Sequence, residues 1–376
     1  MRLPSAAAAC TQRALGALFA FFGLFWLTGL LASPALAAPG DALLSALPER
    51  DAARAVLSLA SEQLAKRVDS TRLQDGLPVP AAGRYRSQQL DAAVRLLDGL
   101  WLQAALGQRD IGDGVDSFAF RHWRLSGQWR LLDAAGPRPA LALRLSRWGD
   151  AAGQTTTTSA VQVPGALLDS VTIEHPADRQ WQADLLATWP ISQSLAVSVG
   201  LGGGHSQLSY GALAATTTRG GCHYQLAFTG NDIFGNLAQP CSAAGGVIRQ
   251  FIDRSGDYGV DVASELAWQG RFVQGLANLA WRSGPWAIKA GYGLQSIRRQ
   301  AIDDILAQRG QARHSTSHQA VLEAAYQLTP QLSGFVRSRW TSTLFFSDLP
   351  VAYNSSTASG LGSHYTTLAL GVRAAF

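Results

Sequence analysis

The feature that most constrains this chain is a strict two-residue alternation of apolar and polar side chains, which begins near Ser117. Its clearest example runs from His122 to Leu131, where one face carries Trp123, Leu125, Gly127, Trp129 and Leu131. Successive side chains of a β-strand point to opposite faces, so this period predicts strands with one apolar surface. Similar segments recur as far as the C-terminus, and the sequence therefore predicts an all-β fold.

The alternation fits either a soluble sandwich or a transmembrane barrel. Three features favour the barrel. The segments are about ten residues long, which is the length that crosses an outer membrane at a tilt. Tryptophans and tyrosines lie near segment ends, as in interfacial girdles. Short connections alternate with long ones, as periplasmic turns and external loops do; the long ones are Gly149–Arg179, Gly202–Asp257, Arg298–Ser317 and Phe345–Ser363.

Counting strands backward from the C-terminus gives nine. In this count Val260–Trp281 is one long strand with a bulge near Gly270, because the apolar phase changes parity there. Single-chain bacterial barrels have even strand numbers. We therefore predict a transmembrane antiparallel β-barrel of about ten strands over residues 111–376, with eight or twelve possible. The tenth strand is expected upstream, within Leu96–Leu106.

The first 38 residues have the order of a secretory signal peptide. Arg2 and Arg13 accompany an apolar run from Ala14 to Ala32, and Ala35-Leu36-Ala37 supplies small residues for a signal peptidase. We predict cleavage near Ala37 or Ala38, with an uncleaved anchor helix as the alternative. Residues 39–110 are predicted to be a short helical segment, periplasmic or plugging the lumen, because apolar side chains recur there at three- and four-residue intervals.

The last twelve residues, Tyr365 to Phe376, end in an aromatic residue with an apolar side chain at every second position before it. This segment resembles the closing strand of bacterial outer-membrane β-barrel proteins. The resemblance implies a Gram-negative cell outer membrane, contact with its lipid and lipopolysaccharide, and recognition by the barrel assembly machinery through Leu370, Val372 and Phe376. Helices before a barrel also resemble autotransporter translocator units, but no passenger lies between the signal and these helices. No narrower family is assigned.

After signal cleavage the chain keeps two cysteines, Cys222 and Cys241, within a Gly-, Thr- and Asn-rich stretch that we interpret as a loop. Exported proteins meet an oxidising compartment, so we predict a disulfide between them. Such a bridge would stabilise the loop by about 3 kcal/mol. A metal site is the alternative, but the C-x-x-C spacing typical of zinc is absent, and we predict no metal and no cofactor.

The charges predict a polar lumen and no nucleic-acid partner. Loss of Arg2 and Arg13 lowers the formal net charge from +5 to +3, too small an excess for nucleic-acid binding. Charged side chains are costly on a lipid-facing surface, so those in the polar phase are expected to line the lumen. They are Arg124, Arg130, Arg144, Asp184, Glu265, Arg282, Lys289, Glu323, Arg337, Arg339 and Arg373.

Three functions follow from this fold. The leading hypothesis is a narrow pore or transport-type protein, because a barrel of about ten strands leaves little open bore. The first alternative is a structural or adhesive barrel that contacts an unknown surface ligand through the disulfide-pinned loop Thr216–Ile252. The second is an outer-membrane hydrolase, for which His314 and His318, near Asp303 and Asp304, are weak catalytic candidates. On balance the sequence favours a protein that is not an enzyme.

Overall fold

The computed structural model describes residues 41–47, 53–65, 84–112, 115–163, 165–242, 246–342, 353–355, 358 and 364–376. The predicted signal peptide, residues 1–38, lies outside these residues. Within the described part of the chain, no helix is long and apolar enough to cross a bilayer.

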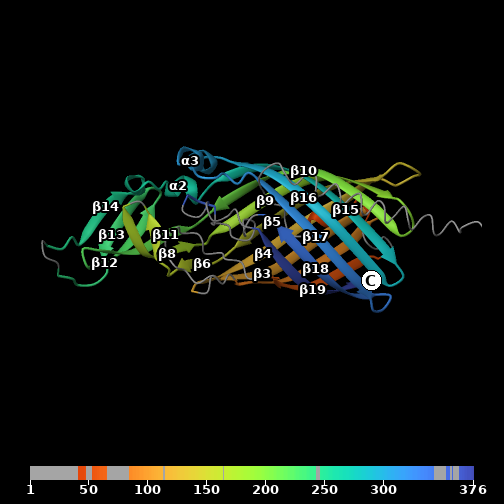
Figure 1. The fold of residues 1–376 in the computed structure, drawn as a ribbon, viewed down its shortest axis with the longest axis horizontal. Coiled ribbons are helices and arrows are strands. Elements are labelled where there is room, and N and C mark those ends of the chain that lie inside the picture. Colours follow the sequence, from red (N-terminus) through yellow and green to blue (C-terminus); the bar gives the residue numbers. More distant parts are fainter. Residues whose placement is uncertain are drawn as a thin grey trace, which may run out of the picture. The chain divides into compact units, whose positions relative to one another are not determined.

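Twelve antiparallel strands pair around a closed barrel (Figure 1). Neighbours in sequence pair with each other, except that β5 pairs with β9, β10 pairs with β15, and β1 closes the barrel on β19. The strands are β1 Ala55–Leu64, β2 Arg84–Leu97, β3 Leu100–Gly112, β4 Ser117–Leu132, β5 Ala140–Ala151, β9 Ala177–Pro190, β10 Leu195–Ser209, β15 Gln269–Ser283, β16 Trp286–Arg299, β17 Thr316–Gln327, β18 Leu332–Thr341 and β19 Tyr365–Ala375.

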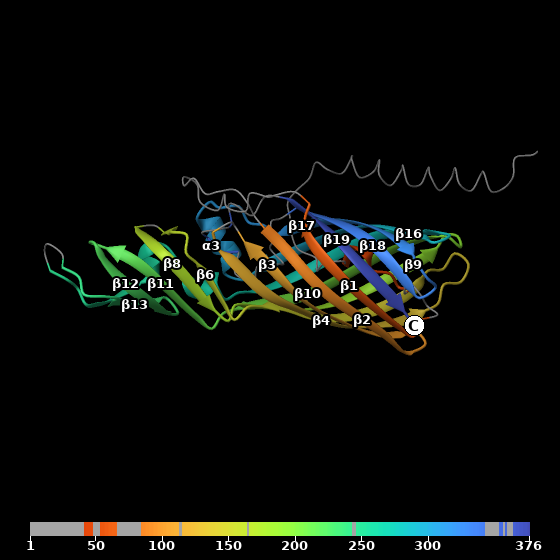
Figure 2. The same cartoon turned by 90° about the horizontal axis from the view of Figure 1, so that it is seen from below.

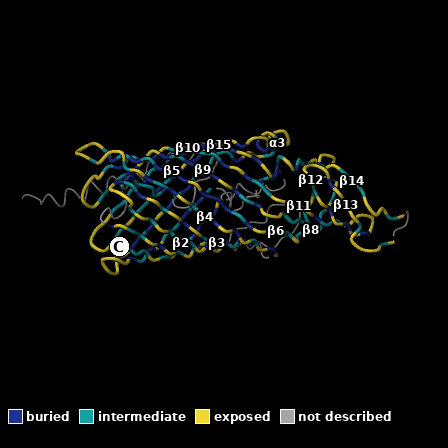
Figure 3. Tube along the Cα trace, turned by 180° about the vertical axis from the view of Figure 1, so that it is seen from behind, coloured by how far each residue is buried: buried dark blue, intermediate teal, exposed yellow. Residues whose placement is uncertain are grey.

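Exposed and buried residues alternate along these strands (Figure 3). Leu201 is 74% exposed and Val273 is 64% exposed on the outer wall, whereas Gly200 and Gln274 beside them are buried in the interior. A continuous outer surface of large apolar side chains is stable in hydrocarbon and not in water, and a closed sheet leaves no unpaired backbone edge there. The barrel therefore crosses a membrane with its strands.

The prediction of about ten strands is corrected to twelve, at the upper limit of the expected range. The two strands beyond the expected ten are β1 and β2, and both lie, with most of β3, in the segment 39–110 that is interpreted as helical from the sequence. The expected strand within Leu96–Leu106 does exist, since β3 begins at Leu100. The helical prediction for this segment is wrong over all three strands.

The reason is that this segment carries apolar residues in both strand phases. Leu90, Val94 and Leu96 of β2 face outward with a two-residue period, but Ala93 faces inward and completes an apparent helical spacing. Alanine fits a tight interior as well as an apolar wall, so spacing alone cannot separate the two periods. The turn Asp98-Gly99, with Gly99 at φ 80°, is a hairpin signal that separates β2 from β3.

A second, seven-stranded antiparallel sheet, here called the external sheet, replaces two of the predicted long loops (Figure 2). It continues the barrel pair β9 and β10 through β8 and β11, whose register begins at Ala212 opposite Glu174. Cys222 and Cys241 form the predicted disulfide, with Cys222 at the start of a strand of this sheet. The strands are β6 Gln154–Thr157, β7 Val161–Val163, β8 Ala166–Glu174, β11 Ala212–Arg219, β12 Cys222–Thr229, β13 Asp232–Leu237 and β14 Gln250–Arg254.

The described helices are short. They are the 3-10 helices η1 Asp41–Leu43 and η2 Ser255–Tyr258, and the α-helices α2 Val262–Glu265 and α3 Ile302–Gln308. The interpretation of Val260–Trp281 as one bulged strand is therefore wrong, because α2 occupies its first part and β15 begins only at Gln269. The change of apolar parity marks a helix with an Asp261 N-cap, whose side chain accepts a hydrogen bond from the Ser264 backbone N–H.

Candidate functional site in the barrel lumen

The two ends of the barrel differ. At one end, here called the short-turn end, β2–β3, β4–β5, β9–β10, β15–β16 and β17–β18 are joined by short connections, and the C-terminus lies beside the start of β1. The external sheet, α2 and α3 follow strand ends at the opposite, long-loop end. In outer-membrane barrels short turns face the periplasm and long connections face the exterior. By this rule the external sheet is expected on the outer side.

Residues 41–47, here called the lumenal segment, lie inside the barrel near the short-turn end. The Ala46 backbone N–H donates to Thr188 Oγ1 at 2.9 Å, and the Gln128 amide donates to the Ser45 carbonyl at 2.9 Å. The Asn278 amide donates to the Leu44 carbonyl. These side chains project from β4, β9 and β15, so the segment is held from several sides of the wall.

A glycine of β16 lets this segment lie directly against the barrel wall. A Cβ added to Gly291 would overlap the Ala42 carbonyl and crowd Leu43. Only a residue without a side chain allows such an approach. Ala46 is fully buried and packs with Ala140, Ala142 and Leu186 of the inner wall. The lumenal segment therefore fills part of the bore that the barrel would otherwise leave open.

A cavity of about 210 Å³ lies in the lumen beside Leu44 of the lumenal segment. Its lining includes Arg124 and Arg144 of β4 and β5, and Arg337 and Arg373 of β18 and β19. Asp91 of β2 also lines it. Here this space is called the arginine cavity, because positive side chains reach it from opposite parts of the wall.

One glutamate connects two of these arginines. Glu323 of β17 accepts hydrogen bonds from Arg337 at 2.6 and 2.9 Å, and Arg373 lies 3.1 Å from the same carboxylate. Lys289, also a predicted lumen residue, is in register with Glu323 on β16. Glu323 is buried, so its charge depends on these cations for compensation.

Other predicted lumen residues are also buried on the inner wall. The Arg144 guanidinium donates to Ser126 and Ser146 at 3.2 and 3.1 Å. Asp184 accepts from Gln182 and Gln274 amides, each at 2.7 Å. Arg339 forms an ion pair with Glu62 of β1 at 3.1 Å. Three of these contacts, those of Arg144 with Ser126, Asp184 with Gln274 and Arg339 with Glu62, join different strands, so the inner wall is a polar network and not a row of isolated charges.

Three predicted lumen residues lie at or beyond the ends of the bore. Arg130 forms an ion pair with Asp133 at 2.9 Å beside the β4–β5 turn, and Arg282 is exposed at the end of β15. Glu265 is not on a strand but in α2, at the long-loop end, where it is buried and lies 3.0 Å from Arg309. The prediction that Glu265 lies on a strand wall is wrong, because α2 and not a strand occupies residues 262–265.

At the long-loop end, an apolar cluster packs inside the described part of the barrel, and no sequence pattern predicts it. Inward side chains of five strands meet there with Ile302 and Leu306 of α3 and with Tyr353. The five are Tyr85, Ile111, Phe120, Leu208 and Tyr365. Because each stands alone near one end of a strand, no local pattern in the sequence marks them as a group.

A second unpredicted group lies on the inner wall at the long-loop half. Arg109 of β3 lies 2.7 Å from Asp150 of β5, and His122 Nδ1 is 3.3 Å from the same carboxylate. The Ser206 hydroxyl donates to Asp178 at 3.2 Å. The inward phase of β4 already marks His122, but Arg109 lies in the segment interpreted as helix, which hides the pair.

The two catalytic candidates do not share a site. His314 is buried in the loop after α3, where its Nε2 lies 2.7 Å from the Ala358 carbonyl. Burial lowers the pKa of His314 because it disfavours the charged imidazolium. His318 lies in the outward phase of β17 and interacts with the Tyr292 hydroxyl. One histidine faces the interior and the other the outer wall, which gives no support to a common nucleophile–base arrangement.

The proposed assembly residues face outward. Leu370 and Val372 are exposed on the outer wall of β19, and Phe376 follows its end. Their backbone pairs on both sides, with β1 and β18, so the side chains and not a free edge are available to a partner in the folded barrel. Recognition by assembly machinery stays a prediction.

No protein-family model and no curated protein matches the chain. Solved structures do. The β-domain of the Bordetella autotransporter Brka is 9% identical over 86% of this chain and all of its own, with a TM-score of 0.42. The NalP translocator domain from Neisseria meningitidis is 13% identical over 86% of this chain and 88% of its own, at 0.41.

The NanC porin is 7% identical over 85% of this chain and 98% of its own, with a TM-score of 0.41. This chain is an outer-membrane β-barrel. That conclusion rests on its own closed sheet of twelve strands and its apolar outer wall. Similarities of this size transfer no activity, so function has to be argued from the lumen and the external sheet of this barrel.

Proposed function

We propose that this barrel is a narrow pore for small anionic solutes, closed by its own lumenal segment. The observation that carries the proposal is the arginine cavity beside Leu44. Four arginines and one aspartate are among the described residues that line it. Even after Glu323 beside them is counted, positive charge exceeds negative. A low-dielectric wall strengthens this field, which favours anions inside the bore.

The size of the barrel agrees with a narrow pore. Eight strands leave room only for side chains, whereas about sixteen leave an aqueous channel. Twelve strands lie between these limits, and the lumenal segment occupies part of the remaining bore. Movement of residues 41–47 toward the short-turn end would join the arginine cavity to the periplasmic side. Passage to the exterior also requires the apolar cluster at the long-loop end to open.

Planar-bilayer recording tests this function. The full barrel should show rare openings, and a variant lacking residues 39–47 should conduct more often. In a KCl gradient the reversal potential of the open state should report preference for chloride over potassium. Matched protein amounts and the heat-dependent gel shift of a folded barrel serve as controls. Silence of both proteins at every voltage, or cation preference, would contradict the proposal.

A surface-binding barrel is the second candidate function, and the external sheet favours it. Seven strands and a disulfide give this region a fixed structure that a simple pore does not require. Binding through the segment Thr216–Ile252 predicts that its deletion abolishes adhesion of cells while the barrel still shows its gel shift. Unchanged adhesion after the deletion would exclude this segment.

A further inference from the structure

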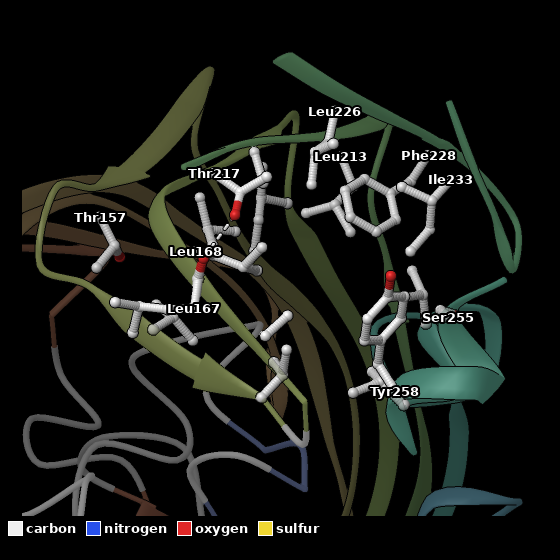
Figure 4. Close-up of a pocket in the computed structure, with 18 of the residues that line it drawn as sticks. Thr157, Leu167, Leu168, Leu213, Thr217, Leu226, Phe228, Ile233, Ser255 and Tyr258 are labelled. Carbon is white, nitrogen blue, oxygen red and sulfur yellow. Dashed lines mark hydrogen bonds between the residues drawn. The ribbon is translucent and has the colours of Figure 1, made fainter. Parts of the chain in front are cut away.

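The external sheet lines a partly open cavity of about 640 Å³ whose wall is mainly apolar (Figure 4). Its lining comes from all seven strands of this sheet, together with β4, η2 and α2. Among the lining side chains are Leu168, Leu213, Leu226, Phe228, Ile233 and Tyr258. Ligand pockets in proteins enclose about 300–1,000 Å³, so this space has the size of a small-molecule site.

The side chains that line the cavity are themselves held in place by packing. Leu213, Leu226 and Ile233 are buried members of apolar clusters on the inner side of the sheet. The Tyr258 ring faces the cavity, while its hydroxyl donates to Asp253 at 2.6 Å (Figure 4). The polar end of this side chain is therefore already hydrogen-bonded, and its ring offers an apolar surface to the space.

The charged residues at the margin of the cavity are engaged with one another. Arg219 lies 3.6 Å from Asp253 and packs its guanidinium over the Phe251 ring at 5.7 Å. Glu265 pairs with Arg309 at 3.0 Å. A charged ligand would have to displace these partners, whereas an apolar ligand would leave them in place. The preferred ligand is therefore uncharged over the part that enters the cavity.

This cavity is separate from the arginine cavity in the lumen, since no residue lines both. It meets the barrel through Phe118 and Phe120 of β4, and Phe120 also belongs to the apolar cluster at the long-loop end. An apolar cavity is poorly hydrated, and filling it with an apolar molecule removes unfavourable contact with water.

We propose that the external sheet binds an apolar small molecule, either a free hydrocarbon or the acyl chain of a lipid, above the mouth of the barrel. This site does not depend on whether the lumen conducts ions. Absence of conductance would not exclude ligand binding at the external sheet, and absence of ligand binding there would not exclude a pore.

Photolabelling of the full barrel in phospholipid nanodiscs tests the site. One sample receives a hexadecane analogue with a diazirine, and another receives phosphatidylethanolamine with a diazirine at the end of one acyl chain. After irradiation, mass spectrometry maps the labelled residues. Leu226 and Ile233 report the cavity, while Leu201 and Val273 on the lipid-facing wall provide an internal standard. The probe that labels the cavity identifies the source of the hydrocarbon.

Two substitutions on one strand make the matched comparison. Ala215 is buried and lines the cavity, so Ala215→Phe fills it; Ala214 lies on the other face of β11 and is exposed, so Ala214→Phe does not. Labelling of Leu226 and Ile233, relative to Leu201 and Val273, should fall at least tenfold in the first variant. It should stay within twofold of the original in the second.

Thr217→Phe narrows the same cavity from a half-buried position and serves if Ala215→Phe loses its gel shift or its disulfide. A similar tenfold loss is expected there. The proposal is overturned if neither probe labels the cavity of the unsubstituted barrel. It is equally overturned if cavity labelling survives both filling substitutions in folded protein.

Discussion

Thr188 contacts the lumenal segment through two polar interactions, one with Ala46 and one with Ser45. It is fully buried on β9, and its hydroxyl accepts the Ala46 N–H at 2.9 Å and lies 3.1 Å from the Ser45 hydroxyl. Thr188→Val keeps the shape of the side chain but removes this hydroxyl. The Ala46 N–H would then be left inside the lumen without its acceptor.

The size of the effect follows from that orphaned donor. A buried polar group that loses its partner costs about 1–3 kcal/mol. Taking about 2 kcal/mol, the equilibrium between docked and undocked segment shifts by roughly 30-fold, since 1.4 kcal/mol corresponds to tenfold. The barrel itself keeps all its strand pairing, because the change is confined to one inward side chain.

The assay is the open probability of single channels in planar bilayers. Thr188→Val should raise it by roughly 30-fold over a closed baseline, and Thr188→Ser, which retains a hydroxyl, should stay near the original value. Removal of residues 39–47 sets the upper limit. The reasoning is refuted if Thr188→Val and Thr188→Ser have the same open probability while the truncated barrel conducts freely, because the segment would then gate without this hydrogen bond.

Four further predictions follow from the structure. Arg144→Gln should move the reversal potential in a KCl gradient toward zero, while Arg138→Gln, in the exposed β4–β5 turn, should leave it unchanged; equal shifts would remove Arg144 from the selectivity site. Glu323→Gln deprives Arg337 and Arg373 of a buried carboxylate, for which a cost of about 3–5 kcal/mol is expected; the temperature of the gel shift should fall, and a constant temperature would contradict the ion-pair argument. Replacing Cys222 and Cys241 by Ser should cost the external sheet about 3 kcal/mol, seen as faster trypsin cleavage there with an unchanged barrel gel shift. Burial lowers the pKa of His314, so a loop 311–315 that has released this side chain into solvent binds a proton below about pH 6.5 before the packed loop does, and packing of the loop should weaken as the pH falls from 7 to 5. Hydrogen exchange of residues 311–315 should rise in that window, and His314→Gln should abolish the pH dependence.

Much of the barrel could be predicted because each strand carries its own two-residue period. Leu125 and Trp129 face outward as expected, and short connections alternate with long ones as predicted. The strands β1, β2 and β3 could not be assigned by the same rule. Alanine and leucine occur there in both phases, and pairing with β19 and β4 settles the conformation. Where the local sequence fits helix and strand equally well, pairing with neighbouring strands determines which one forms.

The candidate sites, like the fold, could be predicted from the sequence only in part. Charges in the polar phase could be placed on one face of a strand, because a lipid wall excludes them. Which charges meet could not be read, since Glu323 and Arg373 are fifty residues apart in sequence. The apolar cavity has no local signal at all, because its wall combines one face from each of several strands.

The sequence by itself determined that the chain makes antiparallel strands with one lipid-compatible face, because that information is a local period along the backbone. It also determined the disulfide, since Cys222 and Cys241 are the two cysteines that follow the predicted signal peptide. Only the tertiary structure decided that twelve strands close the barrel, that residues 41–47 occupy the lumen and that the long connections form a second sheet around an apolar cavity. Those features depend on contacts between residues far apart in sequence, whose energies no local pattern records.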